Sequence, residues 1–433
     1  MKENFVGYIE SSIRDHWDLP AFSDYKAATL RYADVAERLY RLHALFAECG
    51  ASEDAKLALL GRNSSSWAAV YLATLSYGAT AVPILPDFHP SDCENIIAHS
   101  DSALLFTTES FSEKLDFAKI PGLKAAFSLD DFSLLYERPG SGVKEALARA
   151  EGRFERDYRA RLNPTDFSLE AVDGEKLAAI VYTSGTTGFS KGVMLTHGNF
   201  LSNLQYARKM MPLKRGDTIL SFLPLAHMFG NAFEFIFPFS VGCHITFLGK
   251  MPTTKVLIEA FATVKPRMIL SVPLIIEKIY YKQIKPMLED PKLRALTKLP
   301  LVRRLIDRKI RGKIIGFFGG NVMVVIIGGA SFSPEVEDFL LRIKFPFTVG
   351  YGMTECAPLI CYCDWWKRSK ADCGKLVDRM EMKIVGGSDS APGEIWLRGR
   401  HMNAGTISAA GFAARPAGAW HRTGDLGAID ARG

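Results

Sequence analysis

The stretch Tyr182–Gly192, YTSGTTGFSKG, stands between the apolar runs LAAIV and VMLT. Its glycines let the backbone approach a ligand closely, its hydroxyls can donate hydrogen bonds, and its lysine adds a positive charge. These properties match a polyphosphate ligand. A Ser/Gly-rich linker has a similar composition, but linkers of that kind do not usually stand between two strand-like runs. We therefore predict a phosphate-binding loop that follows a buried strand.

Strand-like apolar runs alternate with helical segments along most of the chain. Residues 32–49 carry apolar side chains on one face and stop at Gly50, and a second helical segment is closed by Gly78. Strands are predicted in AKLALL, LAAIVY, DTILSF, RMILSV and VMVVII, at residues 55–60, 177–182, 217–222, 267–272 and 322–327. This alternation predicts an α/β fold in which helices cover parallel sheets.

The chain has 433 residues, which is too long for a single simple core. We expect two α/β subdomains with parallel sheets, packed in layers, over about residues 1–195 and 196–355. After Glu355 the pattern changes, because MEMKIV alternates strictly and GEIWLRG is a short strand between glycines. Residues 356–433 are therefore expected to form a small antiparallel, barrel-like β subdomain.

Composition gives the chain the character of an ordinary globular enzyme, with 48% hydrophobic and 23% charged residues. The net charge is only +6, yet residues 278–313 contain twelve Lys and Arg against three acidic residues. This basic insertion is either a solvated helical surface or a face for peripheral contact with anionic membrane. It lacks the interleaved aromatic residues typical of nucleic-acid binding, so no nucleic-acid partner is expected.

Seven cysteines, an odd number spread over a long chain, favour reduced thiols and a cytoplasmic protein. The first residues lack an apolar core segment, so no signal peptide is expected. Residues 314–334 carry no charge and are long enough to span a bilayer, but glycines surround a compact VMVVII. That pattern favours a buried parallel strand, and any membrane contact is expected to be peripheral, at the inner face.

Several phosphate-binding and hydrolytic motifs are excluded by spacing. A Walker A loop needs four residues between its glycines and a Ser or Thr after the lysine, whereas Gly185 and Gly188 are too close and Gly192 follows Lys191. The sequence also lacks a G-x-S-x-G elbow, an H-E-x-x-H motif and a G-x-G-x-x-G fingerprint.

The loop instead resembles the phosphate-binding signature of the adenylate-forming (AMP-binding) superfamily. Further motifs follow in that family's order: LPLAHMFG at 223–230, GGASFSPE at 328–335, VGYGMTE at 349–355 and WHRTGDLG at 420–427. VPLIIEKIY at 272–280 and the basic insertion after it look most like long-chain fatty acid–CoA ligases. The resemblance covers nearly the whole chain and implies the fold of that family's large N-terminal domain.

The resemblance implies that a fatty acid is activated with ATP and Mg²⁺ to an acyl-adenylate, whose acyl group then passes to coenzyme A. The residues expected to hold the β- and γ-phosphates are Thr183, Ser184, Gly185, Thr186, Thr187, Gly188 and Lys191. The remaining nucleotide residues are Gly329, Ala330 and Ser331 beside adenine, Tyr351 stacked on it, Gly352, Thr354 on the α-phosphate and Asp425 on the ribose. Glu355 is expected to hold Mg²⁺, and His227 is expected to stand beside the acyl pocket. The expected catalytic residues are Lys191, Thr354, Glu355 and His227.

We also expect an apolar tunnel that holds the hydrocarbon chain of the fatty acid. Its candidate lining residues are Phe222, Met228, Phe229, Phe233, Phe235, Phe237 and Phe239. Ordinary core packing is at least as good an interpretation of any one of them.

Some features depart from the family pattern. Ser190 replaces the usual proline, and GTISAAGFAARPAGA at 405–419 replaces an aromatic segment, so no roles are transferred there. The chain ends near the expected hinge, and without the C-terminal lid domain we expect nucleotide binding but weak adenylation. Alternatives are a ligase that delivers to a carrier protein, a ligase for aryl or amino acids with Glu234 pairing the ammonium, and a non-catalytic acyl- or nucleotide-binding protein.

Overall fold

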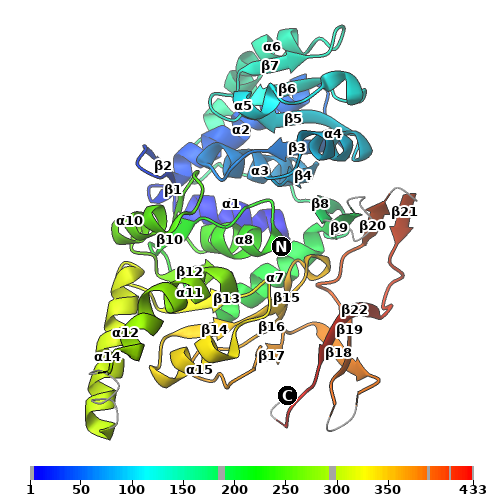
Figure 1. The fold of residues 1–433 in the computed structure, drawn as a ribbon. Coiled ribbons are helices and arrows are strands. Elements are labelled where there is room, and N and C mark those ends of the chain that lie inside the picture. The colour runs from blue at the N-terminus through cyan, green and yellow to red at the C-terminus, as the bar shows by residue number, and fades with distance from the viewer. Residues whose placement is uncertain (1–3, 184–190, 292–298, 388–390, 409–410, 432–433) are drawn as a thin grey trace.

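The computed structural model describes residues 4–183, 191–291, 299–387, 391–408 and 411–431. Figure 1 shows a large sheet with its helices in the N-terminal part of the chain. Smaller sheets with helices follow in the middle part, and long antiparallel strands in the C-terminal part. The architecture is mixed α/β with parallel sheets, as the alternating pattern predicts.

The largest sheet has nine strands in the order β21-β20-β9-β8-β4-β3-β5-β6-β7. Its centre is parallel, whereas β7, β9, β20 and β21 run antiparallel to their neighbours. The strand bounds are β3 Lys56–Leu60, β4 Thr80–Ile84, β5 Ser102–Thr107, β6 Ala125–Ser128, β7 Leu134–Glu137, β8 Leu177–Thr183, β9 Lys191–Thr196, β20 Gly405–Ser408 and β21 Gly411–Ala414.

Helices in the N-terminal part follow the predicted pattern. The amphipathic segment forms α2, and α3 begins after Ser64, whose hydroxyl accepts a hydrogen bond from the Trp67 N–H, and ends at Gly78 with φ +84°. The bounds are α1 Phe5–Asp15, α2 Tyr32–Glu48, α3 Ser65–Tyr77, α4 Pro90–His99, α5 Glu109–Ser112 and α6 Val143–Asp157, with 3₁₀ turns η1 Phe117–Lys119 and η2 Arg159–Arg161.

Two smaller sheets form the middle of the molecule. One has the order β10-β11-β1-β2, and the other is the parallel sheet β12-β13-β14. The strands are β1 Pro20–Asp24, β2 Thr29–Arg31, β10 Thr218–Ser221, β11 His244–Phe247, β12 Met268–Ser271, β13 Val324–Ile327 and β14 Phe347–Val349. The helices are α7 His197–Met210, α8 Met228–Gly230, α9 Phe237–Ser240, α10 Thr254–Val264, α11 Pro273–Ile279, α12 Lys285–Glu289, α14 Pro300–Phe317 and α15 Pro334–Arg342, with π-helical turns η3 Asn231–Ile236 and η4 Tyr280–Ile284.

The C-terminal part is antiparallel, as predicted from its alternating pattern. It contains the sheets β15-β16-β17 and β18-β19-β22. The bounds are β15 Tyr351–Gly352, η5 Thr354–Cys356, β16 Leu359–Tyr362, β17 Lys375–Leu376, β18 Met380–Val385, β19 Gly393–Gly399 and β22 His421–Gly427.

Strand pairing joins segments that are far apart in the chain. Strand β1 runs parallel to β11, and β20 pairs with β9, which brings residues 405–407 beside residues 192–194. The division into subdomains 1–195, 196–355 and 356–433 stays a proposal, because β1 and β20 each pair with a strand from another of these ranges.

The uncharged stretch 314–334 contains the end of α14 and the buried strand β13. A buried strand between glycine turns is what its composition predicts. No helix in the described ranges of the chain has the length and apolarity needed to cross a membrane.

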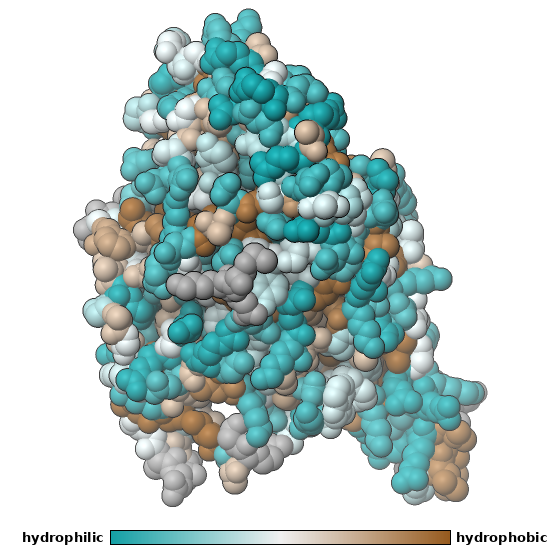
Figure 2. All heavy atoms as spheres, turned by 180° about the vertical axis from the view of Figure 1, so that it is seen from behind, coloured by the Kyte–Doolittle hydropathy of each residue, from teal (hydrophilic) through white to brown (hydrophobic). Residues whose placement is uncertain are grey.

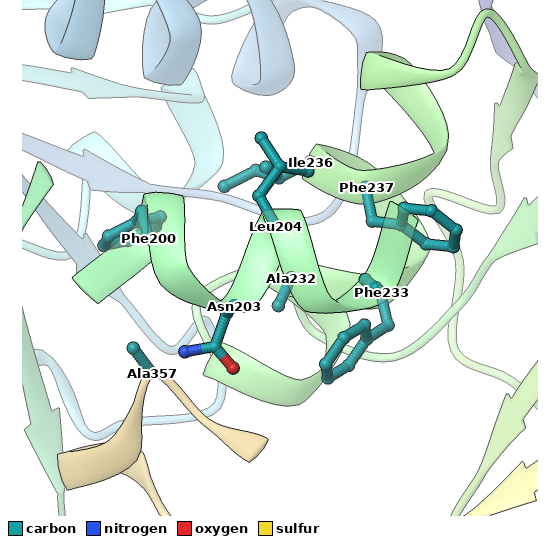
Figure 3. Close-up of a pocket in the computed structure, with 9 residues that line it drawn as sticks. Phe200, Asn203, Leu204, Ala232, Phe233, Ile236, Phe237 and Ala357 are labelled. Carbon is teal, nitrogen blue, oxygen red and sulfur yellow. The ribbon is translucent and has the colours of Figure 1, made fainter. Parts of the chain in front are cut away.

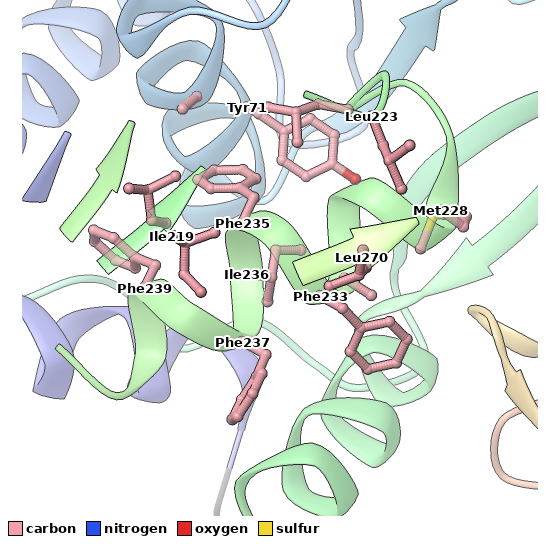
Figure 4. Packing of buried hydrophobic residues seen from close by; sticks show 14 of the residues in the cluster. Tyr71, Ile219, Leu223, Met228, Phe233, Phe235, Ile236, Phe237, Phe239 and Leu270 are labelled. Carbon is pink, nitrogen blue, oxygen red and sulfur yellow. The ribbon is translucent and has the colours of Figure 1, made fainter. Parts of the chain in front are cut away.

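Part of the phenylalanine cluster belongs to the core. The Phe22 ring packs against Phe235 and Phe239, with ring centroids 5.9 and 5.3 Å apart. In Figure 4, Phe235 and Phe239 lie together on one side of η3 and α9, whereas Phe233 points the other way. For Phe235 and Phe239 the core interpretation is therefore the better one.

Candidate active site

A cavity of ≈ 170 Å³, open to solvent, lies at the carboxyl ends of β13 and β14. Ligands of open α/β sheets commonly bind outside the carboxyl ends of the strands, where the connecting loops diverge. The cavity is lined by Met211, His227, Met228, Phe229, Phe233, Ile326, Gly328, Gly329, Gly350, Tyr351, Gly352, Met353, Thr354, Pro358 and Leu359.

Glycines keep this cavity open and its loops close-packed. A Cβ at Gly352 would lie 2.4 Å from the Pro358 carbonyl oxygen, and a Cβ at Gly328 would lie 3.3 Å from the Phe229 ring. Gly329 has φ +84°, a conformation that other residues rarely adopt. The motifs GGAS and YGMT therefore need glycine for steric reasons.

Two predicted nucleotide residues meet at the mouth of the site. The Tyr351 hydroxyl on β15 donates a hydrogen bond of 2.6 Å to Asp425 Oδ2 on β22. Burial, and then this hydrogen bond, raise the pKa of Tyr351 above its usual value. A ring expected beside adenine and a carboxylate expected on the ribose thus lie next to each other.

The lysine of the phosphate loop lies beside the predicted magnesium ligand. Lys191 Nζ is 3.6 Å from Glu355 Oε1. Lys191 begins β9 and pairs in register with Thr183 at the end of β8. Ser184, Gly185, Thr186, Thr187 and Gly188 of the predicted loop lie outside the described residues.

His227 belongs to the wall of the cavity. Its side chain faces open space, yet the surrounding protein lowers its pKa by desolvation. The imidazole is therefore expected to be neutral at pH 7. Thr354 and Gly329 also line the cavity, whereas the exposed Ala330 and Ser331 are not among its lining residues.

The apolar side of the cavity contains Met228, Phe229 and Phe233 from the expected tunnel set, and Met211, which the sequence argument missed. A second, much smaller void of ≈ 10 Å³ lies between α7 and η3 (Figure 3). Phe233 lines both of them.

A polar cluster that sequence reasoning did not find supports Glu355. The backbone N–H of Asn403 donates to the Glu355 carbonyl oxygen at 2.8 Å. Arg415 Nη2 in turn donates to Asn403 Oδ1 at 2.7 Å and lies 3.2 Å from His421 Nδ1. Arg415 belongs to the segment that departs from the family pattern, so no motif indicated it.

The carboxylates present suit a magnesium ion that arrives with ATP. Within the described ranges, no three His, Cys, Asp or Glu side chains gather into a metal-binding group. Mg²⁺ commonly takes one or two carboxylates and completes its shell with phosphate oxygens and water. Glu355 beside Lys191 fits that arrangement and does not form a dedicated metal cage.

Curated relatives are fatty acid–CoA ligases. Long-chain-fatty-acid–CoA ligase 6 of Homo sapiens is 26% identical over 92% of this chain, and the match covers 60% of that protein. Long chain acyl-CoA synthetase 7, peroxisomal, of Arabidopsis thaliana is 28% identical over 78% of this chain and 51% of its own length. The chain thus spans at most 60% of the length of these two relatives.

Solved structures share the fold. The N-terminal domain of FACL13 from Mycobacterium tuberculosis superposes with a TM-score of 0.73 at 18% identity, covering 100% of this chain and 98% of that one. The long-chain-fatty-acid–CoA ligase FadD1 from Archaeoglobus fulgidus gives a TM-score of 0.71 at 18% identity, over 99% and 82% of the two chains. The family described as AMP-binding enzyme matches residues 9–405. This match covers most of the chain, and the chain therefore belongs to the AMP-binding enzyme family.

Proposed function

We propose that this chain binds ATP and a long-chain fatty acid at the cavity lined by Tyr351 and Phe229 and joins them into an acyl-adenylate, from which coenzyme A takes the acyl group. The main support is that one cavity combines two kinds of wall. Tyr351 and Thr354 of the predicted nucleotide motif line it together with His227 and the apolar Met228 and Phe229.

In this reaction a carboxylate oxygen attacks the α-phosphorus of ATP. The bond from that phosphorus to the oxygen bridging to the β-phosphate breaks, and pyrophosphate leaves. Mg²⁺ bound by Glu355 would offset charge on the phosphates. Lys191 would neutralise the leaving group, and the Thr354 hydroxyl would donate a hydrogen bond to the α-phosphate.

The second half-reaction replaces the mixed anhydride with a thioester. The coenzyme A sulfur attacks the acyl carbonyl carbon, AMP departs as the leaving group, and the thiol proton is released to solvent. A neutral His227 beside the acyl side of the cavity adds no positive charge there, which suits the apolar part of the substrate.

The position of Glu234 favours a fatty acid over an amino acid. Glu234 is completely buried, and its Oε2 accepts hydrogen bonds from the backbone N–H groups of Phe222 and Leu223. It is not among the described residues that line the cavity, so it does not offer a carboxylate to a substrate ammonium.

Calorimetric titration with non-hydrolysable acyl-adenylate analogues tests this function. Each buried CH₂ contributes about 0.8 kcal/mol, so four extra methylenes in an apolar site strengthen binding by roughly 3 kcal/mol. We expect affinity to rise from two-carbon to sixteen-carbon tails and to be weak for an aminoacyl analogue. Affinity that is the same for every tail would contradict the fatty-acid assignment.

A matched pair of variants tests whether the acyl tail binds beside Phe229. Phe229→Asp places a charge on the apolar side of the cavity and should remove the tail-length dependence while leaving AMP binding intact. Phe88→Asp alters another partly buried phenylalanine, in the segment between β4 and α4, and should keep the dependence.

We also propose that the segment 278–313 contacts an anionic membrane surface. Leu301 and Leu305, one turn apart on α14, are 75% and 63% exposed, and the cations Arg304 and Arg308 are exposed beside them. Figure 2 shows hydrophobic surface next to hydrophilic surface where α12 and α14 protrude, at the lower right. Exposed leucines among cations are typical of helices that lie in the interface of anionic bilayers.

Vesicle pelleting tests this contact. We expect binding to vesicles with anionic lipid that weakens with salt, and little binding to neutral vesicles. Leu301→Asp with Leu305→Asp should reduce it strongly, whereas Met251→Asp, an exposed apolar residue outside the basic insertion, should not. Binding that is absent or insensitive to salt would remove the proposal.

A further inference from the structure

The backbone turn Phe222–Leu225 connects β10 to the wall of the cavity, and buried side chains hold it. Glu234 Oε2 accepts hydrogen bonds from the N–H groups of Phe222 and Leu223, each at 3.0 Å. Glu234 lies in the π-helical turn η3, and it is 0% exposed. Two neighbouring backbone donors of this turn therefore depend on one buried carboxyl.

Two asparagines bind the rest of the turn. Asn63 Nδ2 donates to the Leu223 carbonyl at 2.7 Å, and the Leu225 N–H donates to Asn63 Oδ1 at 3.0 Å. Asn231 Nδ2 donates to the Leu225 carbonyl at 3.0 Å. Asn63 lies between β3 and α3, so the turn is fixed from the large sheet as well as from η3.

Burying the Glu234 carboxyl costs free energy of folding, so its hydrogen bonds to the turn must offset that cost. Burial raises the pKa of its carboxyl well above the usual value, and its other oxygen, Oε1, has no hydrogen-bond partner among the described residues. Without Glu234, however, the two N–H groups of the turn would be buried with no acceptor. Leaving a buried donor unpaired costs roughly 1–3 kcal/mol, so the loss of both hydrogen bonds would destabilise the turn.

The turn positions the acyl side of the cavity. The His227 N–H donates to the Pro224 carbonyl at 3.0 Å, and Met228 and Phe229 follow directly along the chain and line the cavity. The π-helical segment η3 contributes Phe233 to the cavity wall, and its next residue, Glu234, binds the backbone of Phe222–Leu225. Irregular π-helical turns of this kind are frequent at functional sites.

We propose that Glu234 is a positioning residue for acyl-chain binding: it holds the turn Phe222–Leu225 and, through it, His227, Met228 and Phe229 at the cavity. The proposal rests on the proposed function for the identity of the ligand. The contacts that carry it lie wholly within the protein.

Two substitutions of Glu234 separate positioning from simple stabilisation. Glu234→Met removes the acceptor, and we expect it to weaken binding of a sixteen-carbon acyl-adenylate analogue by about tenfold or more. Binding of the two-carbon analogue should change by less than about threefold, because its tail hardly reaches the apolar side. Glu234→Gln keeps an oxygen for both N–H groups and should restore the long-tail affinity to within about threefold of the unaltered protein.

The matched control is Glu94→Met. Glu94 is also buried and accepts a backbone hydrogen bond, from Asp116 at 2.8 Å, but it lies on α4 away from the cavity. This variant should lose thermal stability without changing the ratio of long-tail to short-tail affinity. An equal loss for both tails in Glu234→Met, or a Gln variant as impaired as the Met variant, would overturn the positioning role.

Hydrogen–deuterium exchange gives a readout that needs no ligand. We expect faster exchange in a peptide covering residues 220–229 for Glu234→Met and unaltered exchange for Glu234→Gln and Glu94→Met. If no analogue binds even the unaltered protein but this exchange pattern is observed, the ligase proposal fails. The conclusion that Glu234 holds the turn Phe222–Leu225 is then still supported. Identical exchange in all variants would refute the proposal itself.

Discussion

Lys191 and Glu355 form an ion pair at the proposed phosphate site. Their 3.6 Å contact places a cation and a carboxylate side by side, where phosphates would recruit the first and Mg²⁺ the second. We expect Lys191→Met to slow ATP–pyrophosphate exchange by about 10²-fold or more, because a cation positioned at a transferring phosphoryl group is lost. Lys209→Met, which removes an exposed lysine paired with Asp378, serves as the control and should leave the exchange rate unchanged.

Phe233 lines both the cavity and the small void between α7 and η3, and its size is expected to limit the length of the acyl chain. Phe233→Ala would enlarge the cavity towards the small void between α7 and η3, so the affinity series of acyl-adenylate analogues should extend to longer tails. Phe237→Ala enlarges only the small void and should leave the tail-length profile unchanged. The same tail-length optimum in both variants would show that Phe233 does not limit the chain.

At the scale of elements, the join between α14 and β13 illustrates how one of two neighbouring glycines can be indispensable. Gly319 and Gly320 both have positive φ, but a Cβ at Gly319 would lie 2.2 Å from the Phe261 carbonyl oxygen, whereas nothing lies within 4 Å of one at Gly320. We expect Gly319→Ala to lower the free energy of unfolding by more than about 2 kcal/mol, and Gly320→Ala by about 1 kcal/mol. Urea denaturation measures both, and equal losses would contradict this account.

Most elements were predictable because local pattern sets them. The amphipathic period of α2 and the apolar runs of β3, β8, β10, β12 and β13 all appear where the sequence places them. The π-helical turn η3 was not predictable, because its hydrogen bonding depends on the packing of Phe233 and Glu234 against other segments.

For the whole molecule, buried histidines make stability depend on pH. Burial lowers the pKa of His43, His197 and His401 to about 4. Their folded pKa lies below the unfolded value of about 6.5, so the unfolded chain binds more protons between these limits. We expect stability to be constant above pH 6.5 and to fall towards pH 4, by about 1.4 kcal/mol per pH unit for each histidine.

Calorimetric melting between pH 7.5 and pH 4.5 measures this dependence. His197→Phe supplies the control, because neither ring nitrogen of His197 has a hydrogen-bond partner among the described residues and the ring packs beside Phe5. This variant should show a shallower decline of the melting temperature. A flat profile from pH 7 to pH 5 would contradict the proposed burial of the three neutral imidazoles.

The sequence by itself determined the fold class, the order of the motifs and the family, because strand and helix periods and short motifs are local properties of the chain. Only the tertiary structure decided which of the predicted residues meet. It joined Tyr351 to Asp425, set Lys191 against Glu355 and added Arg415 to their surroundings. It also showed that Glu234, a candidate substrate ligand by sequence, accepts hydrogen bonds from the backbone instead. Contacts of this kind depend on how the sheets pack and on whether a buried polar atom finds a partner, and neither is encoded within any single segment.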